Sequence, residues 1–194
     1  MLEIAQSNTP YNRQFQALLE EVHSYDRTEL MSLLDKALSA WQNDEMLPSQ
    51  LFSIMNSIDK SVDKVIQTYR NAQPVFICSF SPIITMGALL SKVFLKVRLF
   101  DVRLINITSP TDLGLLIKTI SSNAPLAVIF SFSLFHFIEM VSAGIKDLLS
   151  LKTTYYAGGV AFNLKPEMKH LLPGVVFPLD LFNLVDLLEI QVNE

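Results

Sequence analysis

Residues 74–96, PVFICSFSPIITMGALLSKVFLK, join a short apolar run to a helical pattern through a loop. Residues 74–80 are mostly β-branched or aromatic and do not alternate with polar residues, which is typical of a strand buried on both faces. Residues 84–97 have the apolar spacing of a helix. A buried strand that leads directly into a helix predicts an α/β unit, whose linking loop normally holds a ligand. This loop has no charged residue and no histidine, and Gly87 is its one glycine.

The same alternation of strand and helix patterns continues to the end of the chain. Strands alternating with helices predict a parallel sheet with helices on both faces. We therefore expect a flavodoxin-like domain with a five-stranded parallel sheet over residues 73–194, with its ligand site beyond the carboxyl ends of the strands. The expected strands after the first are VRLINIT (102–108), PLAVIFSF (125–132), TTYYAGG (153–159) and GVVFPL (174–179), and the expected helices are 84–97, 111–122, 134–150 and 180–190.

The N-terminal part of the chain has a different pattern. Apolar residues recur at spacings of three and four along 15–22, 30–41 and 51–69, which predicts amphipathic helices. Asp26 or Thr28 and Ser49 are the expected N-caps of the second and third helices. Residues 1–72 are therefore expected to form an antiparallel helical bundle that covers the α/β domain.

Composition excludes several classes of protein. The chain has 194 residues, of which 50% are hydrophobic, and this apolar surplus suits a ligand cavity or an interface between identical copies. A net charge of −4 argues against direct binding of nucleic acid. The longest apolar stretch, residues 124–138, is shorter than the ~20 residues of a membrane span. A single cysteine, Cys78, and the lack of a signal-peptide pattern favour a cytoplasmic protein.

The usual catalytic patterns are missing from the expected loops. The loop after the first strand lacks the glycines of a phosphate loop or a dinucleotide fingerprint, and no acidic cluster follows that strand. The sequence contains no nucleophile elbow and no Cys/His set with metal-ligand spacing. We therefore expect a protein that is not an enzyme.

This order of elements resembles the cobalamin-binding modules of corrinoid methyltransferases and of cobalamin-dependent light-sensing regulators, in which a helical cap precedes a flavodoxin-like domain. The resemblance covers nearly the whole chain and depends on the order and spacing of several segments. These segments are AWQNDEMLPSQLFSIMNSIDKSV (40–62), SPIITMGALLSKVFLKVRLFDVRLINIT (81–108), SFSLFHFIEMVSAGIKDL (131–148) and YYAGGVAFN (155–163).

The chain departs from that family at the residues that hold cobalt. The family's signature loop reads Asp–x–His–x–x–Gly, and counting back from Gly87 puts Pro82 and Ile84 at the Asp and His positions. Light-sensing members also carry Glu–His after a Trp and nine residues, a spacing that leads from Trp41 to the apolar residues 51–52. These departures argue against cobalamin held by a histidine. Cobalamin that keeps its own base, another tetrapyrrole such as haem or a bilin, or no ligand at all remain as alternatives.

The resemblance also implies a set of residues that shape a ligand slot. Gly87 would let a helix begin close to a ligand. The remaining cofactor-binding candidates are Ile84 in the first loop, Ser131, Ser133 and Leu134 along the slot for the nucleotide tail, and Gly158 and Gly159, which would keep that slot open. The alternative reading is structural, because paired glycines often form turns and serines often cap strands.

His136 is the candidate metal ligand, because neutral imidazole binds iron and cobalt well and this residue follows the third expected strand. Trp41 is the candidate to stack on a planar ring. Both residues have a structural alternative, since a histidine on an apolar helix or a tryptophan in a bundle often belongs to the core.

Three functions remain open at this stage. The first is a non-catalytic sensor that binds a tetrapyrrole between cap and sheet and signals to a protein partner. The second is a ligand-free interaction module in which Ile84 and its neighbours close the pocket. The third is a corrinoid carrier of a methyltransferase, which the missing histidine disfavours.

Overall fold

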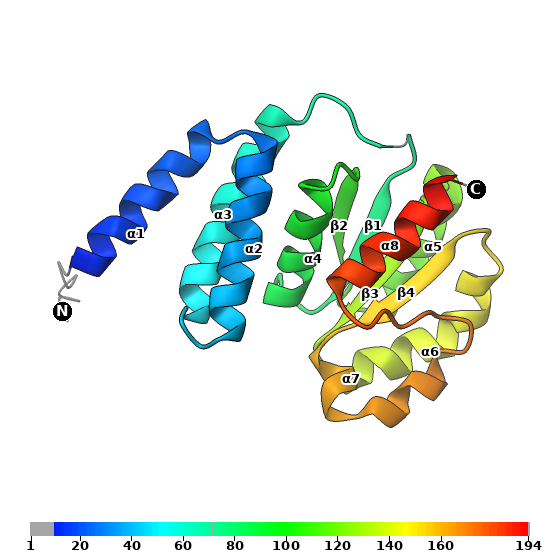
Figure 1. Cartoon of the computed structure of the whole chain (residues 1–194). Helices are drawn as coiled ribbons and strands as arrows, with labels where there is room; N and C mark the ends of the chain where they lie inside the picture. Colours follow the sequence, from blue (N-terminus) through cyan, green and yellow to red (C-terminus); the bar gives the residue numbers. More distant parts are fainter. Residues whose placement is uncertain (1–9, 71, 194) are drawn as a thin grey trace. The chain divides into compact units, whose positions relative to one another are not determined.

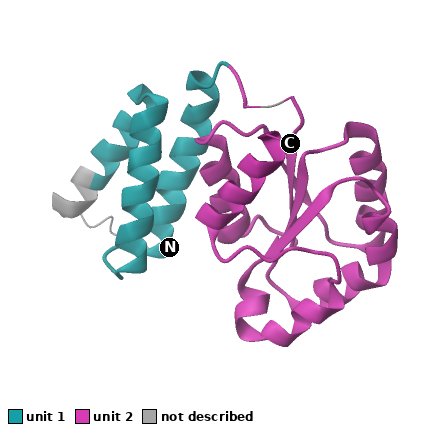
Figure 2. Ribbon diagram, turned by 45° about the vertical axis from the view of Figure 1, so that its right-hand side comes forward, with its two compact units in different colours: residues 1–67 teal, residues 68–194 magenta. Residues whose placement is uncertain are grey.

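The computed structural model describes residues 10–70 and 72–193 (Figure 1). The chain divides into two compact units, residues 1–67 and 68–194, which are coloured separately in Figure 2. No helix in the described part of the chain combines the length and the hydropathy that a membrane crossing requires.

The first unit consists of the helices α1 (Pro10–Glu21), α2 (Arg27–Gln42) and α3 (Pro48–Val65) with a short 3-10 turn, η1 (Val22–Ser24). Leu30 and Leu34 of α2 and Ile54 of α3 are fully buried, as the helical spacing predicted. The expected cap of α2 is confirmed at Asp26, whose carboxylate accepts the Glu29 N–H at 2.9 Å.

The expected cap of α3 at Ser49 is wrong. The helix begins after Leu47, with Pro48 in its first turn. Proline suits the first helical position because its missing N–H would have no partner there. The Gln50 side chain accepts the Leu47 N–H at 3.0 Å and takes over part of the capping role.

The second unit contains a parallel sheet of order β2-β1-β3-β4, with strands β1 (Val75–Phe80), β2 (Val102–Asn106), β3 (Ala127–Phe132) and β4 (Thr154–Gly158). All three pairings are parallel and in register. Every residue of β1 and of β3 is buried. The prediction of an α/β protein with a buried parallel sheet is therefore confirmed.

The expected fifth strand over 174–179 is not formed. Val176 makes an isolated parallel bridge to Tyr156, with the Ala157 N–H donating to Val176 O at 2.9 Å. Gly174, at φ +80°, turns the chain just before this bridge. Pro178 follows two residues later and has no N–H for a ladder. The described sheet therefore has four strands.

Helices cover both faces of the sheet (Figure 2). They are α4 (Met86–Lys96), α5 (Pro110–Asn123), α6 (Phe135–Leu149), α7 (Val160–Leu164) and α8 (Leu181–Asn193), with a 3-10 helix η2 (Pro166–Leu171) after α7. α5 and α6 pack on the face that bears Phe76, Cys78 and Phe80. α4 and α8 contact each other and cover the alternate residues of the strands on the opposite face.

The α5/α6 face is filled largely by aromatic rings. Phe80 stacks on Phe132 at a centroid distance of 4.5 Å, and Phe132 meets Phe162 edge-on at 5.6 Å. Cys78 is fully buried among them, and burial raises the pKa of its thiol. A thiol buried in this way stays protonated at neutral pH and is unreactive.

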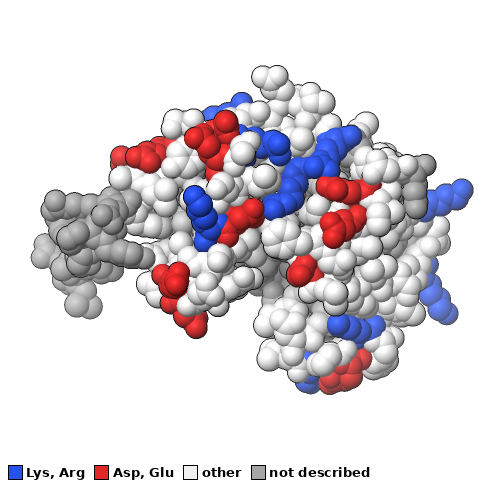
Figure 3. Space-filling view, in the orientation of Figure 1, with Lys and Arg blue, Asp and Glu red and all other residues white. Residues whose placement is uncertain are grey.

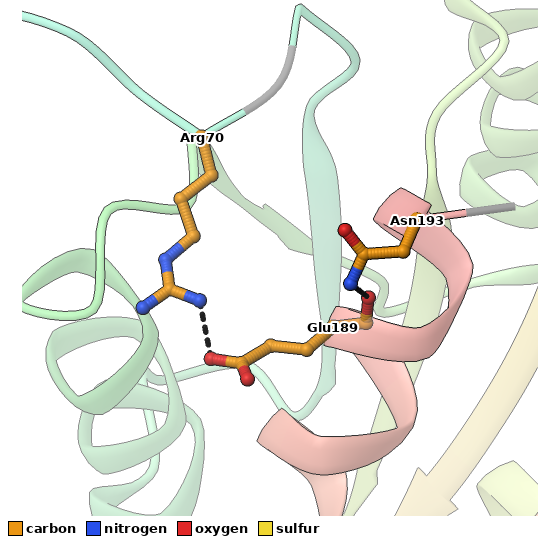
Figure 4. Close-up of polar contacts among 3 residues, drawn as sticks. All are labelled: Arg70, Glu189 and Asn193. Carbon is orange, nitrogen blue, oxygen red and sulfur yellow. Dashed lines mark hydrogen bonds and ion pairs between the residues drawn. The ribbon is translucent and has the colours of Figure 1, made fainter.

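Arg70 ties the start of the second unit to its last helix (Figure 4). Its backbone N–H donates to Leu99 O at 2.8 Å, and its guanidinium pairs with the Glu189 carboxylate. Asn193 donates to the Glu189 carbonyl at 2.7 Å and closes the last turn of α8. More than a third of each ion-pair side chain is exposed, so this pair contributes little to stability.

Asp112 caps the start of α5. Its carboxylate accepts the Thr108 N–H and hydroxyl at 2.8 Å and the Ser109 N–H at 2.9 Å. These hydrogen bonds, those from Thr108 first, hold the pKa of Asp112 below its ordinary value of 3.8.

We predict that Asp112→Ala lowers the thermal midpoint at neutral pH, because three hydrogen bonds are lost. A depressed carboxyl pKa stabilises the fold above the unfolded-state pKa and stops doing so as the pH falls through the folded-state pKa. The gap between the wild type and the variant should therefore shrink at acidic pH. Circular dichroism at about pH 7 and about pH 3 measures it. Equal gaps at both pH values would contradict this role, and Asp147→Ala, an exposed acid on α6, is the control.

Candidate functional site

One row of residues crosses the sheet at its carboxyl edge. The register pairs Asn106 of β2 with Ser79 of β1, Ser79 with Ser131 of β3, and Ser131 with Gly158 of β4. Register partners in a parallel sheet have their side chains on the same face. The next row inward, Ile77, Ile129 and Tyr156, is hydrophobic and buried. We call Asn106, Ser79, Ser131 and Gly158 the polar row.

Ser79 has the most unusual environment in the polar row. Its side chain is fully buried, and its Oγ finds no hydrogen-bond partner among the described residues. Burial of an unsatisfied hydroxyl costs about 1–3 kcal/mol. Such an atom in a folded protein calls for an explanation, and a hydrogen bond to a ligand is one.

The first turn of α4 stands next to the polar row. A Cβ atom built on Gly87 would lie 3.9 Å from Ser131 Oγ, so the helix backbone and the serine are close neighbours. Thr85 is the N-cap residue of α4, and its Oγ1 accepts the Ala88 N–H at 3.2 Å. The sequence placed Gly87 and Ser131 at one site, and the structure brings them together.

The two glycines after Ala157 have different surroundings. Gly159 has φ +117°, and a Cβ atom there would lie 2.2 Å from the Phe132 carbonyl oxygen. Only glycine fits this close approach of β4 to the end of β3. A Cβ atom on Gly158 would have no atom within 4 Å. Gly159 therefore shapes the edge of the sheet, while Gly158 leaves open space at the end of the polar row.

The loop after β1 is held by its own backbone. Ser81 Oγ accepts the Ile83 N–H at 3.3 Å, a local turn that leaves Ile83 70% exposed and Ile84 46% exposed. Ile84, the candidate for closing the pocket, is thus half exposed at the carboxyl edge.

Leu134 and His136 lie just after β3, at the start of α6. Leu134 is the N-cap residue and is 47% exposed, and Ser133 before it is half-buried. His136 is exposed, with its ring 4.0 Å from that of Phe137. Because α6 packs on the Phe80 face, His136 starts from the opposite face of the sheet to the polar row.

Trp41 lies in the other unit. It occupies the last turn of α2 and is half-buried. It therefore belongs to residues 1–67, whereas the other candidates belong to residues 68–194.

The carboxyl edge carries almost no ionisable groups. The segments around the strand ends are 79–91, 104–111, 131–138 and 157–164, and together they contain no Asp, Glu, Lys or Arg and one histidine, His136. No group of three or more His, Cys, Asp or Glu side chains in the described chain could hold a metal ion. These four segments thus offer hydroxyl, amide, backbone and aliphatic groups. The Lys165 ammonium lies next to them, 4.5 Å from the centre of the Phe135 ring.

Ser79 and Asn106 were missed in the sequence. Each is a polar residue near the end of an otherwise apolar run, which is a weak signal by itself. Only the register shows that they stand beside Ser131 and Gly158.

Comparisons with known proteins define the fold. The chain matches no protein-family model and no curated protein. A cobalamin-binding protein from Desulfitobacterium hafniense DCB-2 matches with a TM-score of 0.54 at 10% identity, over 91% of this chain and 98% of that one. The monomethylamine corrinoid protein of Methanosarcina barkeri matches with a TM-score of 0.51 at 9% identity, over 90% of this chain and 89% of that one. The chain therefore has the fold of cobalamin-binding proteins, and the resemblance is confirmed at the level of the fold.

The residues at the carboxyl edge suit a polar arm of a corrinoid better than they suit its metal ion. The unpartnered Ser79 hydroxyl and the open space at Gly158 suit a polar arm that enters beside the sheet. The loop 81–87 has no imidazole, thiolate or carboxylate to bind a metal. His136 is the remaining imidazole near this edge.

The paired glycines give a test of this geometry. We predict that Gly159→Ala destabilises the fold by about 3 kcal/mol or more, because it combines a positive φ with a clash against Phe132. Gly158→Ala should change stability by no more than about 0.5 kcal/mol, since its new methyl group enters open space. Urea unfolding of the two variants measures this. Similar losses from both would contradict the assigned roles.

Proposed function

We propose that this protein is a non-catalytic sensory or regulatory protein that binds a tetrapyrrole, namely a corrinoid, haem or a bilin, and signals its ligand state to a protein partner. The observation that carries the proposal is the polar row, and above all its unpartnered Ser79 hydroxyl. Its place at the carboxyl edge is where open α/β sheets bind ligands. The two solved structures of similar fold are described as cobalamin-binding and corrinoid proteins, which supports a ring of this kind.

The chemistry of the edge supports binding without catalysis. General acid–base catalysis and nucleophilic catalysis need titratable groups placed near the substrate. The segments at the strand ends contain His136 alone. A single exposed imidazole suits an axial ligand of a bound metal, and we assign His136 that role.

Surface charge supports a protein partner over nucleic acid. On the face of the molecule drawn in Figure 3, Lys and Arg side chains lie beside Asp and Glu side chains. The net charge of −4 points the same way, since phosphate binding needs a basic surface. Ligand binding would bias the conformation that the partner recognises.

A ligand-free interaction module is the second candidate function. The observation that favours it is the set of exposed aliphatic residues around the carboxyl edge, because a partner protein would cover them. These residues are Ile83, Ile84, Leu134 and Val160, with exposed fractions of 70%, 46%, 47% and 50%.

The visible absorption spectrum separates the candidates. The protein is purified, and its spectrum is recorded as isolated and after incubation with cobalamins, haemin and biliverdin followed by gel filtration. We predict one ring retained per chain, with a band that identifies it. A protein that stays colourless with all of these rings would contradict the proposal and favour the interaction module. Methyl transfer to or from a bound corrinoid would instead indicate a carrier protein.

His136→Ala tests the assigned axial ligand. The variant should lose or shift the band of a metal-containing ring, because the imidazole sets the ligand field of the metal. Its thermal midpoint should stay close to that of the wild type, since His136 is exposed. His170→Ala, an exposed histidine on η2, is the matched control. An unchanged spectrum in His136→Ala would exclude the axial role without excluding ring binding.

A further inference from the structure

We infer that two copies of this chain pair through the outer edge of β2, with the two β2 strands antiparallel. The pairing joins the two four-stranded sheets into one continuous sheet. This inference goes beyond the proposed function, because it concerns self-association and does not depend on a bound ring.

The outer edge of β2 carries free backbone groups. β2 is the first strand in the sheet order, so β1 is its one partner strand. The Val75 N–H of β1 donates to Asp101 O at 2.7 Å, which fixes the side that the odd-numbered residues of this segment turn toward β1. Neighbouring residues of a strand present their N–H and C=O groups to opposite sides. The outward groups therefore belong to Val102, Leu104 and Asn106, and no hydrogen bond from another described residue reaches them.

The opposite edge of the sheet is blocked. Val176 donates to Tyr155 O and accepts the Ala157 N–H, both at 2.9 Å, so the outer groups of β4 are occupied there. Pro178 follows and has no N–H to offer to a further strand. Among the described strands the sheet thus has one open edge. Two copies that pair through this edge form a closed dimer, because the joined sheet has a blocked edge at each end.

β2 lacks the features by which edge strands usually avoid pairing. It contains no proline, and its register with β1 runs without a bulge. Its one charged residue, Arg103, contacts Asp101 Oδ2 at 3.4 Å and Asn123 Oδ1, at the end of α5, at 3.3 Å. These contacts hold the charge on the α5 face of the strand. An uninterrupted edge of this kind is a template for another strand.

Self-pairing fits one register best. When Leu104 lies opposite the partner's Leu104, Val102 lies opposite the partner's Asn106. The outward N–H and C=O groups of all three residues then meet groups of the second copy. Arg103 faces the partner's Ile105 in this register, so no like charges are directly opposite each other. A register that places Arg103 opposite its own counterpart would set two guanidinium groups together.

The same register covers apolar surface on both faces of the sheet. Leu104 and Ile105 are half-buried in the single chain. Leu104 is the register partner of Ile77 and shares its face, whereas Ile105 packs against the core on the α5/α6 face. In the dimer the two Leu104 side chains meet, and each Ile105 meets the aliphatic stem of an Arg103. Both apolar side chains therefore lose exposed area on pairing.

Charge-swapped variants of the full chain test the inference. Sedimentation velocity at protein concentrations of about 5–200 µM measures association, and we expect the wild type to shift from monomer to dimer over this range. Leu104→Lys should weaken the dimer at least about tenfold, because like charges then lie directly opposite each other. Leu104→Glu should do the same by itself. An equimolar mixture of the two variants should associate again, since unlike charges then face each other.

Two further variants complete the test. Leu179→Lys is the control, because Leu179 is 92% exposed and lies between the blocked edge and α8, so association should not change. Asn106→Pro removes an outward N–H and no hydrogen bond to β1, so circular dichroism should show an intact fold. The same change should weaken the dimer about tenfold, since each copy loses a hydrogen bond to the other.

A wild type that stays monomeric over this concentration range would overturn the inference. A dimer that Leu104→Lys and Asn106→Pro leave intact would also overturn it, as would a mixture of Leu104→Lys and Leu104→Glu that does not associate. Assembly beyond the dimer would contradict a single open edge. The absorption spectrum of the ring tests the proposed function separately, so either proposal can fail while the other stands.

Discussion

The parallel pairing of β1 with β2 on one side and β3 on the other determines which residues lie at the candidate site. Together with the pairing of β3 and β4, it fixes the register across the sheet, so that residues from four separate segments end at the same height. Ile77 and Ile129 fall into the buried floor, and Ser79 and Ser131 fall into the row above it. A shift of one residue in β1 would turn Ser79 toward the aromatic core and bring Cys78 to the α4 face. The candidate site is thus a direct consequence of strand register.

The other face of the sheet holds this arrangement in place. The stacked rings of Phe80 and Phe132 lie one residue further along their strands than Ser79 and Ser131, on the opposite side of the sheet. Gly159 lets the chain pass within contact distance of the Phe132 backbone, which closes the edge of the sheet there. The rigid aromatic packing beneath and the tight crossing at Gly159 make the carboxyl edge a firm support for a ligand.

The sequence predicted the order of the four strands and of the longer helices, but it did not reveal α7 and η2 and it predicted a fifth strand that does not form. It was much less informative about the site. Apolar runs without alternation predicted β1 and β3 correctly, because both faces of these strands are buried. The run at 174–179 is also apolar, yet its Gly174 and Pro178 restrict the pairing to Val176. Local pattern cannot show how many residues of a run will find a partner strand.

Some residues of the candidate site could be predicted from the sequence, and others could not. Ser131, Gly87 and Gly158 could be proposed from a family resemblance, and the structure places them together. Ser79 and Asn106 depend on register between distant segments, which no local spacing encodes. His136 followed the right strand but starts from the other face of the sheet, a distinction that requires the direction in which α6 leaves β3.

The most direct test of the central claim, that the carboxyl edge of this sheet binds a ligand, is a map of amide chemical shifts. The 15N-labelled protein is titrated with cyanocobalamin while the backbone resonances and the Asn106 side-chain amide are followed by two-dimensional NMR. We expect the largest shifts at Ser79, Asn106, Ser131 and Gly158, with resonances at the amino edge, such as Val75 and Ala127, unchanged. Shifts confined to residues away from the carboxyl edge, or no shifts at saturating ligand, would contradict it.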